Sequence, residues 1–248
     1  MSLRTPTWDE FAWSAFLYGA IGGDKSYQEL MNKTVFLNDL RNNPQNLTIQ
    51  NIRKELITGF LNRWKCRVIN SNQSASSIKN QLINLLPFLH NLNGLDITTC
   101  DFNKIFNIQQ KNYTAQQIIY CLYKGYRNLG YRFGPTATSK LLHVLQPDLF
   151  VMWDGEIIKY YKRLKIGVSS SYQGYFNYLL EMQNIAQQIS LNFNQASLTP
   201  KKLPNQSLEN YLSVNMGYSP TKSIAKYIDE YNWVTITNNV KVPPNWHP

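Results

Sequence analysis

The chain of 248 residues is long enough to bury a substantial core, in one large domain or two small ones. Hydrophobic residues make up 43% of it and aromatic residues 13%, which excludes a disordered protein. The formal net charge of +10 favours a polyanionic partner, either nucleic acid or an anionic membrane surface. Solubility alone is the other explanation for such a charge.

Cysteines and histidines are few and scattered, at Cys66, Cys100 and Cys121 and at His90, His143 and His247. This pattern predicts neither a zinc site nor a disulfide framework, so we expect no cofactor and a reducing compartment. The chain start has no secretory signal pattern, and no apolar run approaches the roughly 20 residues that span a bilayer. We therefore expect a cytoplasmic protein with no membrane partner.

Apolar residues spaced three and four apart predict helices from one end of the chain to the other. In chain order, the expected helices cover about residues 8–18, 48–64, 76–89, 114–129, 135–145, 154–164, 171–193, 207–214 and 220–231. The expected N-caps are Thr48, Ser76 or Ser77, Thr114 and Asp154. Residues 234–242 alternate weakly and are expected to be extended.

These helices predict an all-α fold, with residues 1–242 as one helical unit and residues 243–248 as a tail. Helical proteins of this size often form two lobes with a cleft between them, and the boundary is expected near residues 93–112. The excess positive charge gathers in two stretches, residues 51–67 and 122–165. Clustering of this kind favours a polyanion more strongly than net charge does.

The most informative segment is Leu129–Ile158, which reads LGYRFGPTATSKLLHVLQPDLFVMWDGEII. It predicts a helix end at Gly130, a tight turn, a new helix with Pro135 in its first turn, an apolar loop, and Asp154 opening a further helix. This arrangement resembles the helix-hairpin-helix DNA glycosylase superfamily. Thr136-Ala137 matches the family's Thr-Ala after the hairpin, and Asp154-Gly155 matches its Asp-Gly.

The resemblance implies DNA as the partner and Asp154 as the key carboxylate for cleavage of an N-glycosidic bond. A carboxylate there stabilises the positive charge that develops on the sugar, or activates a water. Turn amides and a helix start bind phosphate, and basic side chains add contacts. The expected DNA-binding residues are Arg132, Gly134, Thr136 and Lys140. The expected pocket for a flipped-out base consists of Tyr131, Phe133 and Trp153.

The chain departs from the family in three ways. Pro135 occupies the position of the lysine in the bifunctional enzymes, which excludes a Schiff-base nucleophile there and favours water. Lys140, one turn further into the helix, is an alternative amine. Tyr131 and Phe133 replace the two hairpin glycines, and three cysteines cannot hold a Cys₄ iron–sulfur cluster.

Three hypotheses follow from the sequence. The first is a glycosylase-like enzyme that acts through Asp154. The second is a module with the same scaffold that binds nucleic acid or protein without catalysis. In the third, a helical protein unrelated to DNA uses Asp154 only as a helix cap, Trp153 as a core residue and its basic runs as solvated faces.

Overall fold

The computed structural model describes residues 5–23, 25–195, 206–217, 221–241 and 243, and within them the chain is mostly helical. Most of the predicted tail, residues 243–248, therefore lies outside the described residues. The N-terminal elements are α1 (Trp8–Ala20), α2 (Lys25–Met31), α3 (Thr34–Asn42), a 3₁₀ turn η1 (Pro44–Asn46), α4 (Ile49–Asn51), a π-helical continuation η2 (Ile52–Asn62) and α5 (Asn72–His90).

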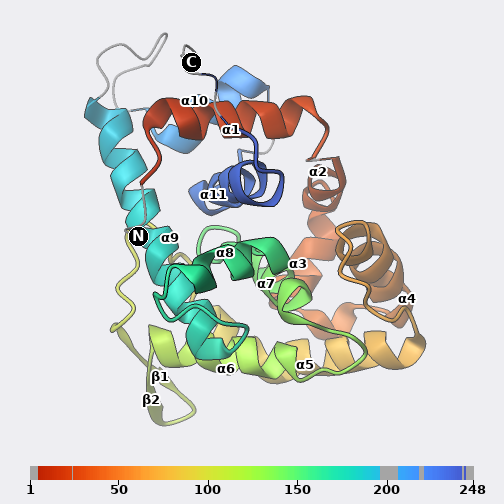
Figure 1. Ribbon diagram of the computed structural model, residues 1–248. Coiled ribbons are helices and arrows are strands. Elements are labelled where there is room, and N and C mark those ends of the chain that lie inside the picture. The colour runs from red at the N-terminus through yellow and green to blue at the C-terminus, as the bar shows by residue number, and fades with distance from the viewer. Residues whose placement is uncertain (1–4, 24, 196–205, 218–220, 242, 244–248) are drawn as a thin grey trace.

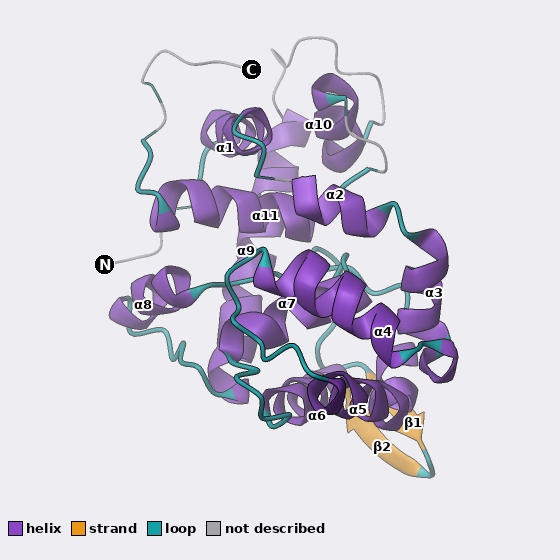
Figure 2. Cartoon of the chain, turned by 90° about the vertical axis from the view of Figure 1, so that its right-hand side faces the viewer, coloured by secondary structure: helices purple, strands orange, loops and turns teal. Residues whose placement is uncertain are grey.

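A short hairpin, β1 (Ile105–Ile108) and β2 (Lys111–Thr114), interrupts the helices. The remaining elements are α6 (Ala115–Arg127), α7 (Pro135–Leu145), α8 (Gly155–Arg163), α9 (Tyr172–Gln195), α10 (Leu208–Met216), α11 (Ile224–Asn232) and a π-helical end η3 (Trp233–Thr237). Helices α1, α10 and α11 lie at one end of the molecule, α5 and α6 at the other, and α9 runs between them (Figures 1 and 2).

Side-chain caps set many of the helix starts. Thr48 and Thr114 cap α4 and α6 as the sequence predicts, and each forms a reciprocal pair of hydrogen bonds with the residue three positions on. The start of α5 differs from the prediction, because Ser71 rather than Ser76 or Ser77 is its cap. Ser71 and Ser74 each donate a backbone N–H to the hydroxyl of the other. The polar residues that follow Ser71 therefore belong to the first turn of the helix and not to the loop before it.

One predicted detail of the backbone is wrong, and one element was not predicted at all. Residues 234–237 are helical, because η3 continues directly from α11, so the expected extended stretch does not form there. The β1–β2 hairpin, in turn, was not expected from the sequence. Its turn residues Gln109 and Gln110 have φ values of 50° and 66°, a conformation that usually calls for Asn or Gly, so the sequence lacked the usual signal.

Helix α7 lies at the centre of the core. Its residues from Ala137 to Leu145 are all buried, and it packs against α6, α3 and η2. A helix buried on every side must satisfy its polar side chains internally. The hydroxyl groups of Thr138 and Ser139 accordingly donate to the backbone carbonyls of Gly134 and Thr136. These two hydrogen bonds tie the first turn of α7 to the buried part of the same helix.

Candidate active site

A cavity of about 580 Å³ opens where five parts of the chain meet. Its walls come from the α1–α2 turn, the end of η2, the starts of α7 and α8, and the α11–η3 segment. The lining includes Tyr18, Gly22, Gly23, Lys25, Ser26, Arg63, Trp64, Lys65, Thr136, Lys140, Trp153, Asp154, Gly155, Ile157, Asp229, Trp233, Thr237 and Asn238. Its volume falls within the roughly 300–1,000 Å³ of small-molecule sites.

Asp154 caps α8 at the wall of this cavity. Its Oδ1 accepts the backbone N–H groups of Glu156 and Ile157, both at 2.9 Å, which are two of the unpaired donors of the helix start. Its Oδ2 accepts the hydroxyl of Thr237 at 2.8 Å. Since a carboxylate oxygen has two lone pairs, Oδ2 keeps one for a ligand. The carboxylate is thus oriented by α8 and η3 together.

Lys140 lies inside the cavity rather than on the outer surface. It is only 6% exposed, its Nζ donates to the Trp64 carbonyl at 3.0 Å, and the same Nζ lies 4.7 Å from the centre of the Trp64 ring. Burial lowers the pKa of Lys140, while the carboxylates of Asp229 and Asp154 oppose that shift. A contact with the outer phosphate backbone, as expected from the sequence, does not fit this position.

Trp153 lines the cavity, and three further aromatic residues do so from distant segments. Trp153 is almost fully buried, and its Nε1 donates to the Pro135 carbonyl at 3.2 Å, which ties the loop before α8 to the start of α7. The others are Tyr18, Trp64 and Trp233, with the rings of Tyr18 and Trp233 meeting edge to face at 5.1 Å. No local sequence pattern marks these three residues as part of a cavity, because only tertiary packing brings them together.

The structure does not bring the predicted Tyr131 and Phe133 to this cavity. Phe133 is buried in the core, and the carbonyl of Tyr131 accepts a hydrogen bond from the N–H of Ile69. Gly130, Tyr131 and Arg132 all have a positive φ, at 75°, 49° and 61°. The turn between α6 and α7 therefore has a glycine-like backbone although two of the three residues carry side chains.

The same turn limits where a phosphate can bind. The N–H groups of Phe133 and Gly134 donate within the turn, to the carbonyls of Gly130 and Arg132. Pro135 has no N–H, and no side chain of the described residues caps α7. An anion at this helix start would therefore meet the backbone of Thr136, whose side chain lines the cavity, while Arg132 is exposed on the turn outside it.

Asp229 is a second carboxylate of the cavity, and it was not among the residues predicted from the sequence. It is 5% exposed, and its Oδ2 accepts from Lys226 Nζ at 3.1 Å. Lys226 also pairs with Glu230 at 3.1 Å, and Glu230 pairs with Lys222 at 2.8 Å. Burial raises the pKa of Asp229, while the Lys226 ammonium opposes that shift. Charges spaced three and four apart on a helix are typical of an exposed face, so their burial could not be predicted from the sequence.

Basic side chains border the cavity. Lys25, Arg63 and Lys65 are exposed residues of its lining, and Arg63 also pairs with Glu29. Arg63 and Lys65 belong to the first of the two basic stretches, so the structure brings that stretch to the segment carrying Asp154.

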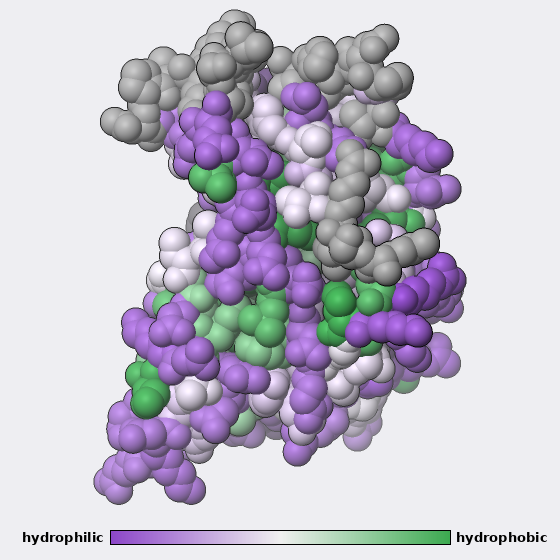
Figure 3. All heavy atoms as spheres, turned by 60° about the vertical axis from the view of Figure 1, so that its left-hand side comes forward, coloured by the Kyte–Doolittle hydropathy of each residue, from purple (hydrophilic) through white to green (hydrophobic). Residues whose placement is uncertain are grey.

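The face of the molecule shown in Figure 3 is mostly hydrophilic, with small and separate hydrophobic areas.

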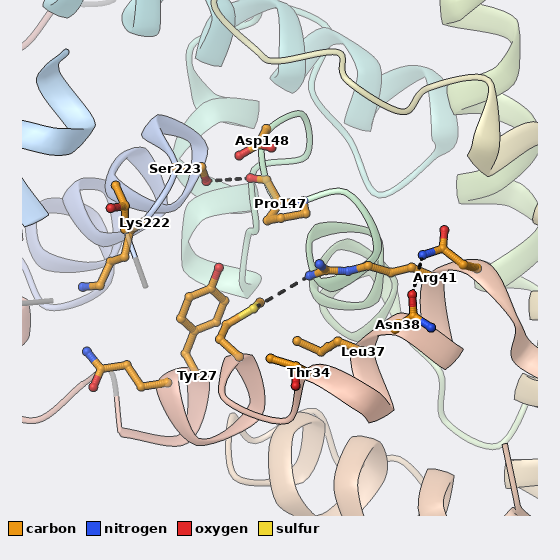
Figure 4. Close-up of a pocket in the computed structure, with 13 residues that line it drawn as sticks. Tyr27, Thr34, Leu37, Asn38, Arg41, Pro147, Asp148, Lys222 and Ser223 are labelled. Atoms are coloured by element: carbon orange, nitrogen blue, oxygen red, sulfur yellow. Dashed lines mark hydrogen bonds between the residues drawn. The ribbon is translucent and has the colours of Figure 1, made fainter. Parts of the chain in front are cut away.

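A second cavity, of about 370 Å³, lies between α2, α3 and the segments around Pro147 and Thr221. Arg41 reaches from α3 toward Met31 and Tyr27 there (Figure 4). Its Nε donates to the Val144 carbonyl at 2.8 Å, so the guanidinium also satisfies a carbonyl in the C-terminal turn of α7. None of the predicted site residues lines this cavity, and we therefore place the candidate site in the larger one.

The described residues hold no cluster of three or more metal-ligating side chains. In the same part of the chain, no helix combines the length and apolar character needed to cross a bilayer.

The chain matches no family model, no curated protein and no solved structure.

Proposed function

We propose that this protein binds DNA with a helix-hairpin-helix glycosylase-like fold and hydrolyses the N-glycosidic bond of an extruded base, with Asp154 as the key carboxylate. One observation carries the proposal: the Asp154 carboxylate lies at the wall of a cavity that also presents Trp64, Trp153 and Trp233. An enzyme acting on a base must take it out of the stack and hold it against apolar or aromatic surfaces.

The proposed role of Asp154 is electrostatic stabilisation of the transition state. Cleavage of the glycosidic bond develops positive charge on the sugar, and a fixed carboxylate stabilises that charge better than water does. Asp154 is fixed through both oxygens, by the α8 backbone and by Thr237. The carboxylate also orients the water that attacks the sugar carbon, so no covalent intermediate is needed in this reaction.

The border of the cavity supports DNA as the substrate. Lys25, Arg63 and Lys65 are exposed beside the cavity, where they would meet phosphates flanking an extruded nucleotide. The start of α7 adds the backbone of Thr136 and the dipole of an 11-residue helix. These contacts position a strand without reading its sequence, as expected of an enzyme that recognises one altered base.

The test is incubation with duplexes that each carry one damaged or modified base, followed by detection of abasic sites. We expect at least one lesion to be excised by the wild type and not by Asp154→Asn. Asp148→Asn is the matched control, because Asp148 lines the other cavity. If no lesion is excised and DNA affinity does not depend on salt, the proposal fails.

A non-catalytic DNA-binding module is the second candidate, and one observation favours it. The carboxylate of Asp154 already accepts three hydrogen bonds from the protein, which is what a structural cap and tether requires. In that case DNA affinity is equal in the wild type and Asp154→Asn, and neither protein releases a base from any duplex in the panel.

A further inference from the structure

The smaller cavity, of about 370 Å³ between α2, α3 and the segment around Pro147, is lined by two opposite charges that do not pair with each other. These are the guanidinium of Arg41 and the carboxylate of Asp148. Among the described residues, neither group lies within ion-pair distance of an oppositely charged side chain. The third charged residue of the lining, Lys222, differs because its ammonium pairs with the carboxylate of Glu230 at 2.8 Å.

The Arg41 side chain is half-buried, extends from α3 into the cavity and is only partly satisfied there (Figure 4). Its Nε donates to the Val144 carbonyl at 2.8 Å, whereas its Nη2 donates only to the Met31 sulfur at 3.8 Å, and a thioether is a weak acceptor. Its Nη1 has no hydrogen-bond partner among the described residues. Burial lowers the pKa of Arg41, which shows that the guanidinium has lost hydration. The fork of Nη1 and Nη2 is therefore available to a carboxylate, which it matches in shape.

Asp148 places the opposite charge where the cavity opens, because it is an exposed residue of the lining. Its backbone carbonyl accepts the N–H of Ile97 at 2.9 Å, which fixes the residue, but its carboxylate has no hydrogen-bond partner among the described residues. Burial raises the pKa of Asp148, and the Arg41 charge opposes that shift. The two charges therefore act on each other across the cavity without being in contact.

The lining also includes an apolar surface, formed by Met31, Leu37, Pro147 and the ring of Tyr27. The Tyr27 hydroxyl is engaged by His143 Nε2 at 2.9 Å, so the protein itself already satisfies this polar group. The volume of the cavity lies within the roughly 300–1,000 Å³ of small-molecule sites. The cavity thus combines an available cation, an available anion and an apolar surface in a space suited to a small molecule.

A ligand with only a negative charge would be attracted by Arg41 and repelled by Asp148, and a ligand with only a positive charge would meet the reverse. A molecule that carries both charges is attracted by both groups. We propose that the smaller cavity binds an α-amino acid with an apolar side chain, its carboxylate on Arg41 and its ammonium group on Asp148. This proposal goes beyond the function proposed above, because no residue that lines the larger cavity takes part in it.

The experiment is isothermal titration calorimetry of the full chain with L-leucine, L-methionine and L-phenylalanine. Each amino acid is compared with the same acid lacking the amino group and with the same amine lacking the carboxylate. We expect at least one amino acid to bind about tenfold more tightly than either of its two analogues, because each analogue loses one charge-assisted hydrogen bond.

Two variants assign the two charges. Asp148→Asn should weaken binding of the amino acid about tenfold and leave binding of the acid without an amino group unchanged, and it should fold because Asp148 is exposed. Arg41→Lys keeps a positive charge but lacks the fork, so it should weaken both ligands together. Asp39→Asn is the matched control, since Asp39 belongs to α3 like Arg41 but does not line this cavity.

Three results would overturn the proposal. The first is that none of the three amino acids binds at millimolar concentration, and the second is that inorganic phosphate binds as tightly as the best of them. The third is that Asp148→Asn binds the amino acid no more weakly than Asp39→Asn does, including the case in which only Asp154→Asn loses binding and the larger cavity is the site. Base removal is measured without amino acids, so the glycosylase proposal and this one can fail separately.

Discussion

The hydroxyl of Thr237 donates a hydrogen bond of 2.8 Å to Oδ2 of Asp154, linking positions 83 residues apart. The start of α8 fixes one carboxylate oxygen, and η3, which packs against α8, fixes the other. The segment Leu129–Ile158 ends long before Thr237, so the C-terminal part of the chain supplies an orienting contact that this segment does not contain.

The first prediction concerns this contact. Thr237→Val keeps the side-chain shape but removes the donor, and should lower the free energy of unfolding by about 1 kcal/mol. If Asp154 acts on the substrate, the rate of base removal should also fall, because Oδ2 is no longer oriented. Thr235→Val is the control, since Thr235 donates to the Tyr231 carbonyl in the same segment. An equal loss of rate in both variants would show that the Asp154 contact has no special role.

The second prediction separates the cap from the catalyst at Asp154. Asn caps a helix about as well as Asp, whereas Ala loses about 1 kcal/mol. Asp154→Asn should therefore unfold close to the wild-type urea midpoint, and Asp154→Ala clearly below it. Base removal should be lost in both. If activity instead follows stability, with Asp154→Asn fully active, Asp154 is a cap only.

The parts of the fold that could be predicted from sequence are those set by local chemistry. Thr114 and Asp154 were predicted as helix caps, and both accept backbone N–H groups at helix starts. The break after α6 followed from Gly130, which has a φ of 75°. Such signals act within a few residues, so one sequence is enough to reveal them.

The cavity could be predicted only in part, for the opposite reason. Trp153, Asp154 and Lys140 lie within one short segment, but Trp64 and Trp233 reach the cavity only through tertiary packing. Asp229 lies among charges spaced as on a solvated helix face, and its burial depends on the packing of α1 and α9 against α11. Helical periodicity shows that a residue is buried, and not which distant segment it will meet.

The third prediction concerns the turn between α6 and α7. Arg132 has a φ of 61°, which costs a residue with a side chain about 1–2 kcal/mol, and it is exposed. Arg132→Gly should raise the free energy of unfolding by about 0.5–1 kcal/mol after the added entropy of the unfolded chain is subtracted. Arg132→Ala removes the same charge but keeps Cβ and should not stabilise. Equal urea midpoints for the two variants would exclude this strain.

The fourth prediction uses His143, which is fully buried. Its Nδ1–H donates to the Phe150 carbonyl at 2.6 Å, and its Nε2 accepts from the Tyr27 hydroxyl at 2.9 Å. Burial lowers the pKa of His143 to about 3, and the positive charges of Lys226 and Arg41 act in the same direction. The folded protein therefore keeps this imidazole neutral at any pH between 3 and its ordinary value of 6.5.

The unfolded chain binds a proton at His143 below pH 6.5 and the folded chain does not, so stability is full above that pH and falls as the pH drops toward 3. Between pH 7.5 and 5.5 the free energy of unfolding should decrease by about 1.4 kcal/mol, as measured by urea titration. The exposed His90 serves as the control: His90→Gln should keep this decrease and His143→Gln should lose it. An unchanged slope in His143→Gln would contradict the assignment.

The last prediction tests the basic border of the cavity. Each lysine that contacts a phosphate releases counterions, so the logarithm of affinity falls with the logarithm of salt by about 0.9 per contact. Lys65→Gln should weaken binding of any duplex at low salt and reduce that slope by about one. Lys79→Gln is the control, because the Lys79 ammonium already donates hydrogen bonds to the carbonyls of Gln45 and Leu47. Identical slopes for the wild type and Lys65→Gln, measured by fluorescence anisotropy, would mean that DNA does not pass this side of the cavity.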